Sequence, residues 1–153
     1  MNGNKGMRIV EIKEKTPILI QKLLNIWEES VKATHLFLSD YEIKNIKQYV
    51  PHALSEILHL VIAEDENGCP VAFMGAENET LEMLFITPEE RGKGLGKTLI
   101  RYGIRNYNIR KLAVNEQNPQ AREFYEHMGF QVYKRTDYDE QGNAYPILYM
   151  SCE

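Results

Sequence analysis

Alternate glycines with basic neighbours form the stretch of this sequence whose chemistry is easiest to interpret. The stretch reads Arg91-Gly92-Lys93-Gly94-Leu95-Gly96-Lys97-Thr98, and it lies between an apolar, strand-like run (residues 81–86) and a helical pattern. The first N–H groups of a helix lack internal partners and carry the positive end of its dipole, and glycines let a ligand approach the backbone. The stretch therefore predicts a phosphate-binding loop. The alternative is a tight turn with a solvated basic rim.

Two common phosphate-binding motifs do not fit this stretch. A P-loop needs Gly, four residues and then Gly-Lys-Ser/Thr. For Gly96-Lys97-Thr98 to end such a motif, position 91 would have to be glycine, and it is Arg91. A dinucleotide fingerprint needs Gly-x-Gly-x-x-Gly, and after Gly92 and Gly94 the third glycine would fall on Lys97. The pattern that does fit is Arg-x-x-Gly-x-Gly.

A second motif lies further along the chain. From Asn118 to Phe130 the sequence fits Asn-x-x-Ala-x-x-Phe-Tyr-x-x-x-Gly-Phe. Together, the two motifs resemble the acetyl-CoA site of the GCN5-related N-acetyltransferases (the GNAT family), and the resemblance covers nearly the whole chain from Met7. The segment 33–38 and the pair Tyr145-Pro146 are similar to the small bacterial YjaB-like members of that family.

The resemblance implies acetyl-CoA as the acyl-donor substrate and a primary amine as the acceptor. It implies that the strand before the glycines separates from its parallel neighbour, residues 111–115. Free strand amides would then bind the pantetheine arm, one of them facing the thioester oxygen, and loop amides would bind the pyrophosphate. The implied cofactor residues are Leu84, Phe85, Ile86, Arg91, Gly92, Lys93, Gly94, Leu95, Gly96, Lys97, Thr98, Asn118, Ala121 and Phe124. A helix cap alone would also explain Asn118.

Tyr125 is the candidate general acid. A phenol at the sulfur can deliver the proton that a departing thiolate takes up, and GNAT enzymes often have a tyrosine at the matching position. The alternative is structural, because Tyr125 also fits the apolar face of a helix with Ala121 and Phe124.

The acceptor side has three candidate residues. An alkylammonium group titrates near ~10.4 and is mostly protonated at neutral pH, so a base is needed. Glu82 is the best placed carboxylate, because strand alternation puts it on one face with Leu84, although a solvent-facing glutamate fits equally well. His35 and Phe37 lie between the first two predicted helices, where this family usually shapes the acceptor pocket. A linker histidine can also simply satisfy local backbone groups, and we favour that alternative for His35.

Hydrophobic periodicity and cap residues predict the elements that position these side chains. We expect helices from Pro17 to Thr34, from the Ser39 capping box to near Pro51, from the glycines to about residue 106, and from 119 to 129. We expect strands at 7–13, 59–64, 71–76, 80–86, 111–115, 131–138 and 145–152, with a two-residue hairpin turn at Asn67-Gly68. The order β-α-α-β-β-β-α-β-α-β-β indicates an α/β, or α+β, fold with a mixed sheet. As the GNAT resemblance implies, that sheet is twisted and mostly antiparallel, and its fourth and fifth strands form the splayed parallel pair.

Length and composition predict one globular domain. The 153 residues contain 43% apolar and 26% charged residues, an ordinary balance for a globular domain. The resemblance implies that residues 7–153 form an N-acetyltransferase domain, after a disordered lead-in of residues 1–6. Met7 is an alternative start. The net charge of −4 argues against nucleic acid or an anionic membrane as partner.

Location and metal content are also predicted. No apolar run reaches the roughly 20 residues that span a bilayer, the N-terminus lacks the apolar region of a signal peptide, and Cys69 and Cys152 show no disulfide framework. We therefore expect a cytoplasmic protein. The histidines and cysteines have no metal-ligand spacing and form no thiol-nucleophile pattern, so we expect no metal and direct attack by the amine.

Several functional alternatives remain open. The same fold could hold acetyl-CoA or CoA as a non-catalytic sensor, with Tyr125 purely structural. The acceptor could be a small amine, an amino acid, a peptide N-terminus, a protein lysine or an antibiotic. A monomer and a homodimer are both consistent with the sequence.

Overall fold

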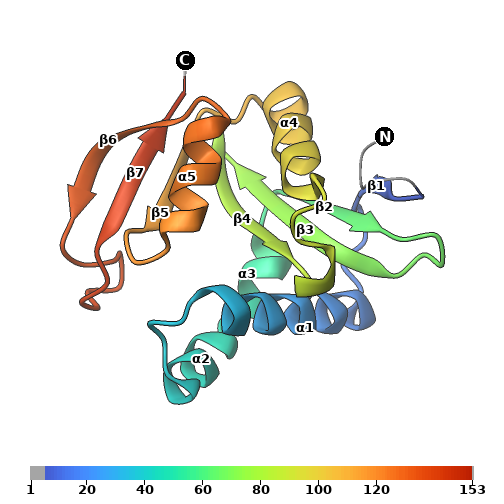
Figure 1. Ribbon diagram of the computed structural model, residues 1–153. Helices are drawn as coiled ribbons and strands as arrows, with labels where there is room; N and C mark the ends of the chain where they lie inside the picture. The colour runs from blue at the N-terminus through green and yellow to red at the C-terminus, as the bar shows by residue number, and fades with distance from the viewer. Residues whose placement is uncertain (1–5, 153) are drawn as a thin grey trace.

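The computed structural model describes residues 6–152, and these residues form one seven-stranded sheet with helices on both faces (Figure 1). The strand order is β1-β2-β3-β4-β5-β7-β6, and every neighbouring pair is antiparallel except β4 and β5. The strands are β1 (Arg8–Glu11), β2 (His59–Glu64), β3 (Pro70–Glu77), β4 (Thr80–Ile86), β5 (Lys111–Asn115), β6 (Gln131–Thr136) and β7 (Ile147–Ser151). The predicted mixed, mostly antiparallel sheet is confirmed. Of the expected lead-in, residues 1–5 lie outside the described residues.

Two apolar clusters separate the helices by face. The helices are α1 (Pro17–Thr34), α2 (Asp40–Lys47), α3 (Val50–Glu56), α4 (Leu95–Tyr107) and α5 (Pro119–His127), with a short 3-10 helix η1 (Pro88–Glu90) before α4. On one face, Leu23 and Trp27 of α1 and Leu54 of α3 pack with Phe73 of the sheet. On the other face, α4 and α5 share a cluster with the neighbouring β3 residues, Ala72 and Met74. Burying a large apolar side chain contributes roughly 1.5–3 kcal/mol, so these clusters fix the helices on the sheet.

The second predicted helix is two helices, and the expectation that it stops near Pro51 is wrong. The Ser39 capping box is present, with Glu42 Oε1 accepting from the Ser39 N–H at 2.9 Å. That helix, α2, ends at Lys47, and Pro51 lies in the first turn of the additional helix α3. A proline is tolerated there because a first-turn N–H has no intrahelical partner to lose.

The connection between β2 and β3 also differs from the prediction. The sequence predicts a two-residue turn at Asn67-Gly68, but Glu64 pairs with Pro70 and five residues lie between the strands. The Asp65 carboxylate accepts hydrogen bonds from the N–H groups of Asn67 at 2.9 Å and Cys69 at 3.0 Å. An aspartate that bonds its own backbone two residues on builds a longer turn.

The strands β4 and β5 separate soon after they meet. They pair only at Thr80 with Lys111 and at Leu81 with Leu112. From Met83 to Ile86, β4 stays paired to β3 on its other side, so its edge toward β5 has no strand partner among the described residues. This opening is the splayed parallel pair that the sequence predicted, and the cavities described below lie along it.

Candidate active site

The glycine-rich loop joins β4 to α4 through backbone that favours glycine. Gly92 and Gly94 have φ values of +77° and +84°, a region that costs other L-residues roughly 1–2 kcal/mol. Gly96 is needed for a different reason. A Cβ on it would lie 3.2 Å from the Ile86 side chain and 3.4 Å from the Phe124 ring, so the missing side chain lets α4 start close to β4 and α5.

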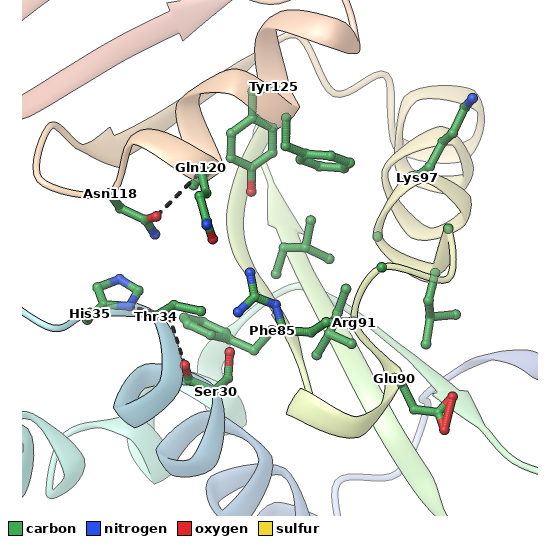
Figure 2. A pocket seen from close by; sticks show the side chains of 18 residues that line it. Ser30, Thr34, His35, Phe85, Glu90, Arg91, Lys97, Asn118, Gln120 and Tyr125 are labelled. Carbon is green, nitrogen blue, oxygen red and sulfur yellow. Dashed lines mark hydrogen bonds between the residues drawn. The ribbon is translucent and has the colours of Figure 1, made fainter. Parts of the chain in front are cut away.

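A cavity of about 440 Å³ opens between this loop, α1, β4 and α5 (Figure 2). Most of the residues predicted from the sequence to bind the cofactor line it, together with two of the other candidates. The predicted residues that line it are His35, Leu84, Phe85, Ile86, Arg91, Gly92, Gly94, Leu95, Gly96, Lys97, Asn118, Ala121, Phe124 and Tyr125. The fold therefore brings the two sequence motifs together around one space.

The lysines and the threonine of the loop are less involved than the sequence indicated. Lys93 and Thr98 are not among the lining residues. The Lys93 ammonium lies 3.3 Å from a carboxylate oxygen of Glu90, and the Thr98 hydroxyl donates to the Gly94 carbonyl at 3.1 Å. The Lys97 side chain points away from the cavity, whereas the Arg91 guanidinium points into it (Figure 2). The loop thus offers backbone N–H groups and one arginine to an anion.

Tyr125 combines burial with a hydroxyl directed at the cavity (Figure 2). Its side chain is 9% exposed, and its ring packs edge-on against Phe124 and Phe130, with centroid distances of 5.1 and 6.1 Å. Burial raises the pKa of the Tyr125 phenol well above its usual range. The group is therefore a neutral donor throughout the physiological pH range.

A second cavity of about 240 Å³ continues along the opening between β4 and β5. Glu82 lines it, but does not line the larger cavity. Glu82 is the extra residue of a β-bulge, because Met83 pairs with Gly75 and Leu81 pairs with Ala76. Bulges re-aim side chains next to active sites, and this one breaks the simple alternation assumed from the sequence. Burial, helped by the charges of Glu140 and Glu77, raises the pKa of the Glu82 carboxyl.

His35 and Phe37 lie where α1 meets the smaller cavity. His35 lines both cavities, and its Nδ1 lies 2.8 Å from the Thr34 hydroxyl oxygen. Burial, followed by the charge of Arg91, lowers the pKa of the His35 imidazole. Phe37 lines neither cavity, but its ring lies between those of His35 and Tyr145, at centroid distances of 5.5 and 5.8 Å.

Comparison with known protein families shows to which family this chain belongs. The family model for the acetyltransferase (GNAT) domain matches residues 26–149. The chain belongs to the GNAT family. The predicted resemblance is confirmed, and the chain is an acetyltransferase.

Individual relatives agree with this family assignment. The peptidyl-lysine N-acetyltransferase YjaB of Salmonella typhimurium is 40% identical over 128 residues, which are 84% of this chain and 88% of that protein. The solution structure of apo-form YjaB from Escherichia coli has a TM-score of 0.84 at 34% identity and covers 95% of this chain and 96% of its own. The PaiA N-acetyltransferase of Thermoplasma acidophilum, solved in complex with coenzyme A, shares the fold. Its TM-score is 0.64 at 20% identity, with 94% of this chain and 99% of that chain covered.

Four side chains of this GNAT site were missed from the sequence. Ser30, Thr34, Glu90 and Gln120 line the larger cavity. Ser30 and Thr34 are four residues apart in the last part of α1, and Thr34 directly precedes His35. That spacing puts both on one helix face, so a signal was present once His35 had been chosen as a site candidate. Glu90 and Gln120 have no such signal.

Two further findings concern the described part of this GNAT chain. No helix within residues 6–152 is both long and apolar enough to cross a membrane. Within the same residues, no three His, Cys, Asp or Glu side chains are grouped so that they could hold a metal ion. The predicted cytoplasmic location and the expected absence of a metal stay predictions.

Proposed function

We propose that this GNAT enzyme transfers the acetyl group of acetyl-CoA to the side-chain amine of lysine in a peptide or protein. The observation that carries the proposal is the meeting of two cavities at Tyr125. One is bordered by the glycine-rich loop, and the other lies between the separated strands and contains Glu82. One cavity suits the donor and the other the acceptor, so the reacting groups would meet between them.

The larger cavity has the chemistry that acetyl-CoA requires. Loop amides and the N-terminus of α4 would bind the pyrophosphate, with Arg91 as a positive partner. The unpartnered edge of β4 at 82–86 would bind the pantetheine arm as a further strand would, because each extended residue offers an N–H and a C=O group. One β4 amide would face the thioester oxygen, and such a donor typically contributes about 10²–10³ in rate. A related fold that is complexed with coenzyme A supports this assignment.

Tyr125 would donate a proton to the thiolate that leaves. Its hydroxyl points into the cavity, and no hydrogen bond joins it to another of the side chains drawn in Figure 2. Neither Cys69 nor Cys152 lines either cavity, which supports direct attack by the amine over an acylated cysteine.

The smaller cavity suits an ammonium group on a flexible chain. Glu82 would attract the ammonium group and take its first proton. The raised pKa makes this carboxylate a stronger base than an ordinary glutamate, as proton removal from an ammonium group requires. The Phe37 ring lies beside His35 and the Tyr145 ring lies beside Phe37, and both rings would pack on an aliphatic stem. Lysine has this combination of stem and charge, and the names of the YjaB relatives support it.

Mass spectrometry of acetylated peptides tests the proposal. The wild-type protein is incubated with acetyl-CoA and two peptides, one with a lysine and a blocked N-terminus, the other with arginine in place of lysine and a free N-terminus. We expect time-dependent acetylation of the lysine peptide alone. Acetylation only at the free N-terminus would redirect the acceptor assignment, and transfer to neither peptide nor to spermidine would favour the sensor alternative.

A further inference from the structure

The junction between the two cavities contains two titratable side chains. Six described residues line both cavities: His35, Leu84, Phe85, Asn118, Ala121 and Tyr125. Of these, His35 and Tyr125 alone carry groups that gain or lose a proton. Tyr125 has the role of proton donor in the proposed function, whereas the His35 imidazole has no role in it so far.

A hydrogen-bonded chain fixes the proton on the His35 ring. The Thr34 hydroxyl donates to the Ser30 carbonyl at 2.8 Å, and the same hydroxyl oxygen lies 2.8 Å from His35 Nδ1 (Figure 2). A hydroxyl has one proton to donate. Since that proton goes to Ser30, Nδ1 must be the donor in the second bond. The neutral ring then carries its proton on Nδ1, and Nε2 is left with a free lone pair.

The environment of His35 keeps the ring neutral. Burial and the Arg91 guanidinium, which comes from the loop before α4, hold the pKa of the imidazole below its usual value. Glu82 of β4 and Tyr125 of α5 are the other titratable groups that line the smaller cavity with His35. Thr34 of α1 is hydrogen-bonded to the imidazole. The Phe37 ring also lies beside the imidazole. At neutral pH Nε2 is therefore a hydrogen-bond acceptor facing the side of Asn118 (Figure 2).

We propose that Nε2 of His35 accepts the second proton that the acceptor amine loses, and that Thr34 is the positioning residue for this step. The proposal rests on the proposed function. An ammonium acceptor must lose two protons to become an amide. The first goes to Glu82 before attack. The second leaves the nitrogen after its bond to the acetyl carbon has formed.

The proton balance explains why a second acceptor is useful. As the C–S bond breaks, the thiolate takes the proton of Tyr125, and Nε2 of His35 takes the proton of the new nitrogen–carbon adduct. Transfer of that proton from the imidazolium to the phenolate, directly or through water, restores both side chains. The net products are the amide, the CoA thiol and the one proton released through Glu82.

Nitrogen NMR of the free protein tests the tautomer independently of turnover. With 15N-labelled histidine, we expect wild-type His35 to carry its proton on Nδ1 with Nε2 unprotonated at neutral pH. Thr34→Ser, which keeps the hydroxyl, should preserve this form, and Thr34→Val should lose it. Protonation of Nε2 in the wild-type ring would overturn the inference, whether or not the protein transfers acetyl groups.

Steady-state kinetics with the lysine peptide tests the chemical role. His35→Gln should lower kcat by about 10²–10⁴-fold, the usual size of an acid–base contribution, with the acetyl-CoA Kd within twofold of wild type. Thr34→Val should lower kcat less, and Thr34→Ser should restore it. His52→Gln, which changes an exposed histidine of α3, should behave as wild type.

Two contrary results would be distinguishable. If wild type acetylates lysine and His35→Gln keeps kcat within twofold, this inference fails and the proposed function stands. If wild type binds acetyl-CoA but acetylates no amine, the proposed function fails and the role of His35 fails with it. Circular dichroism of each variant shows whether a loss of rate reflects unfolding. If His35→Gln is unfolded, the comparison of Thr34→Val with Thr34→Ser tests the role of His35 instead.

Discussion

Tyr125 meets a packing requirement and a chemical one with different parts of the same side chain. The ring is held edge-on between Phe124 and Phe130, while the hydroxyl faces the cavity (Figure 2). The sequence presented these as competing alternatives. Because ring and hydroxyl point to different surroundings, the two roles are compatible, and a substitution that removes only the oxygen separates them.

Tyr125→Phe should therefore be a catalytic change with little effect on stability. We expect kcat with the lysine peptide to fall by about 10²-fold or more, while the thermal unfolding midpoint and the acetyl-CoA Kd stay near wild type. Tyr133→Phe, which alters an exposed tyrosine of β6, is the matched control. A kcat within twofold of wild type would exclude a large general-acid contribution from Tyr125.

The role of Glu82 is testable through the pH dependence of kcat/KM. A base acts only when ionised, and the raised pKa of Glu82 means that it is protonated at a higher pH than an ordinary glutamate. Activity should fall as pH drops through that raised pKa, and Glu82→Gln should remove this acidic limb. Glu140→Gln removes a negative neighbour that raises the Glu82 pKa, so it should keep the limb and move it to lower pH. Unchanged profiles in both variants would remove Glu82 from the mechanism.

At the residue level, the sequence identified the residues that belong to a motif with fixed spacing, such as the glycines of the loop. Gly92, Gly94 and Gly96 occupy positions where backbone angle or close approach requires glycine. Lys93 has the right charge but is paired with Glu90, and no spacing rule could show which cation would find a partner. Ser30 and Thr34 are ordinary helix residues until the fold brings α1 against the cavity.

At the level of elements, α5 brings a cap and a site residue together. Asn118 Oδ1 accepts from the Ala121 N–H at 3.3 Å and caps the helix. The amide nitrogen of the same side chain faces the cavity near His35 (Figure 2). The cap and a ligand contact can thus use opposite ends of one amide group.

Asn118→Asp and Asn118→Ala should separate these two uses. Aspartate caps a helix about as well as asparagine, whereas alanine costs about 1 kcal/mol. We expect the free energy of unfolding to fall in the alanine variant alone, and the acetyl-CoA affinity to fall in both, because neither keeps the amide donor. Ser39→Ala should lose similar stability from the α2 cap without a change in affinity. Wild-type affinity in Asn118→Asp would leave Asn118 as a cap only.

The elements that the sequence misjudged have local causes. The sequence predicts that the second helix ends near Pro51, but Pro51 lies in the first turn of α3, where its missing N–H removes no helical hydrogen bond. The bulge at Glu82 depends on how β4 pairs with β3. Pairing register is a property of two strands, so the alternation of one strand alone could not predict it.

For the whole molecule, the split in the sheet sets where the donor and acceptor sites lie. The β4–β5 pair diverges after Leu81 and Leu112, α4 and α5 share the apolar cluster on one face, and α1 packs on the other. The element order predicted a mixed sheet with helices packed on it, because strand and helix periodicities are strong in most segments, and the GNAT resemblance implied the splayed strand pair. The shape of the acceptor cavity was not predictable, since it depends on His35, which follows α1, and on side chains from β4, β5 and α5 that meet only in the fold.

The central claim is that the glycine-rich loop binds acetyl-CoA, and calorimetric titration tests it most directly. Gly92 and Gly68 share a φ of +77° with open space around each, but only Gly92 lines the cavity. Glutamate at either position imposes the same backbone strain, so Gly68→Glu is a matched control for Gly92→Glu. We expect wild type and Gly68→Glu to bind acetyl-CoA in the micromolar range and not ATP, and Gly92→Glu to show no binding. Failure of wild type to bind either acetyl-CoA or CoA, or undiminished binding by Gly92→Glu, would contradict the account.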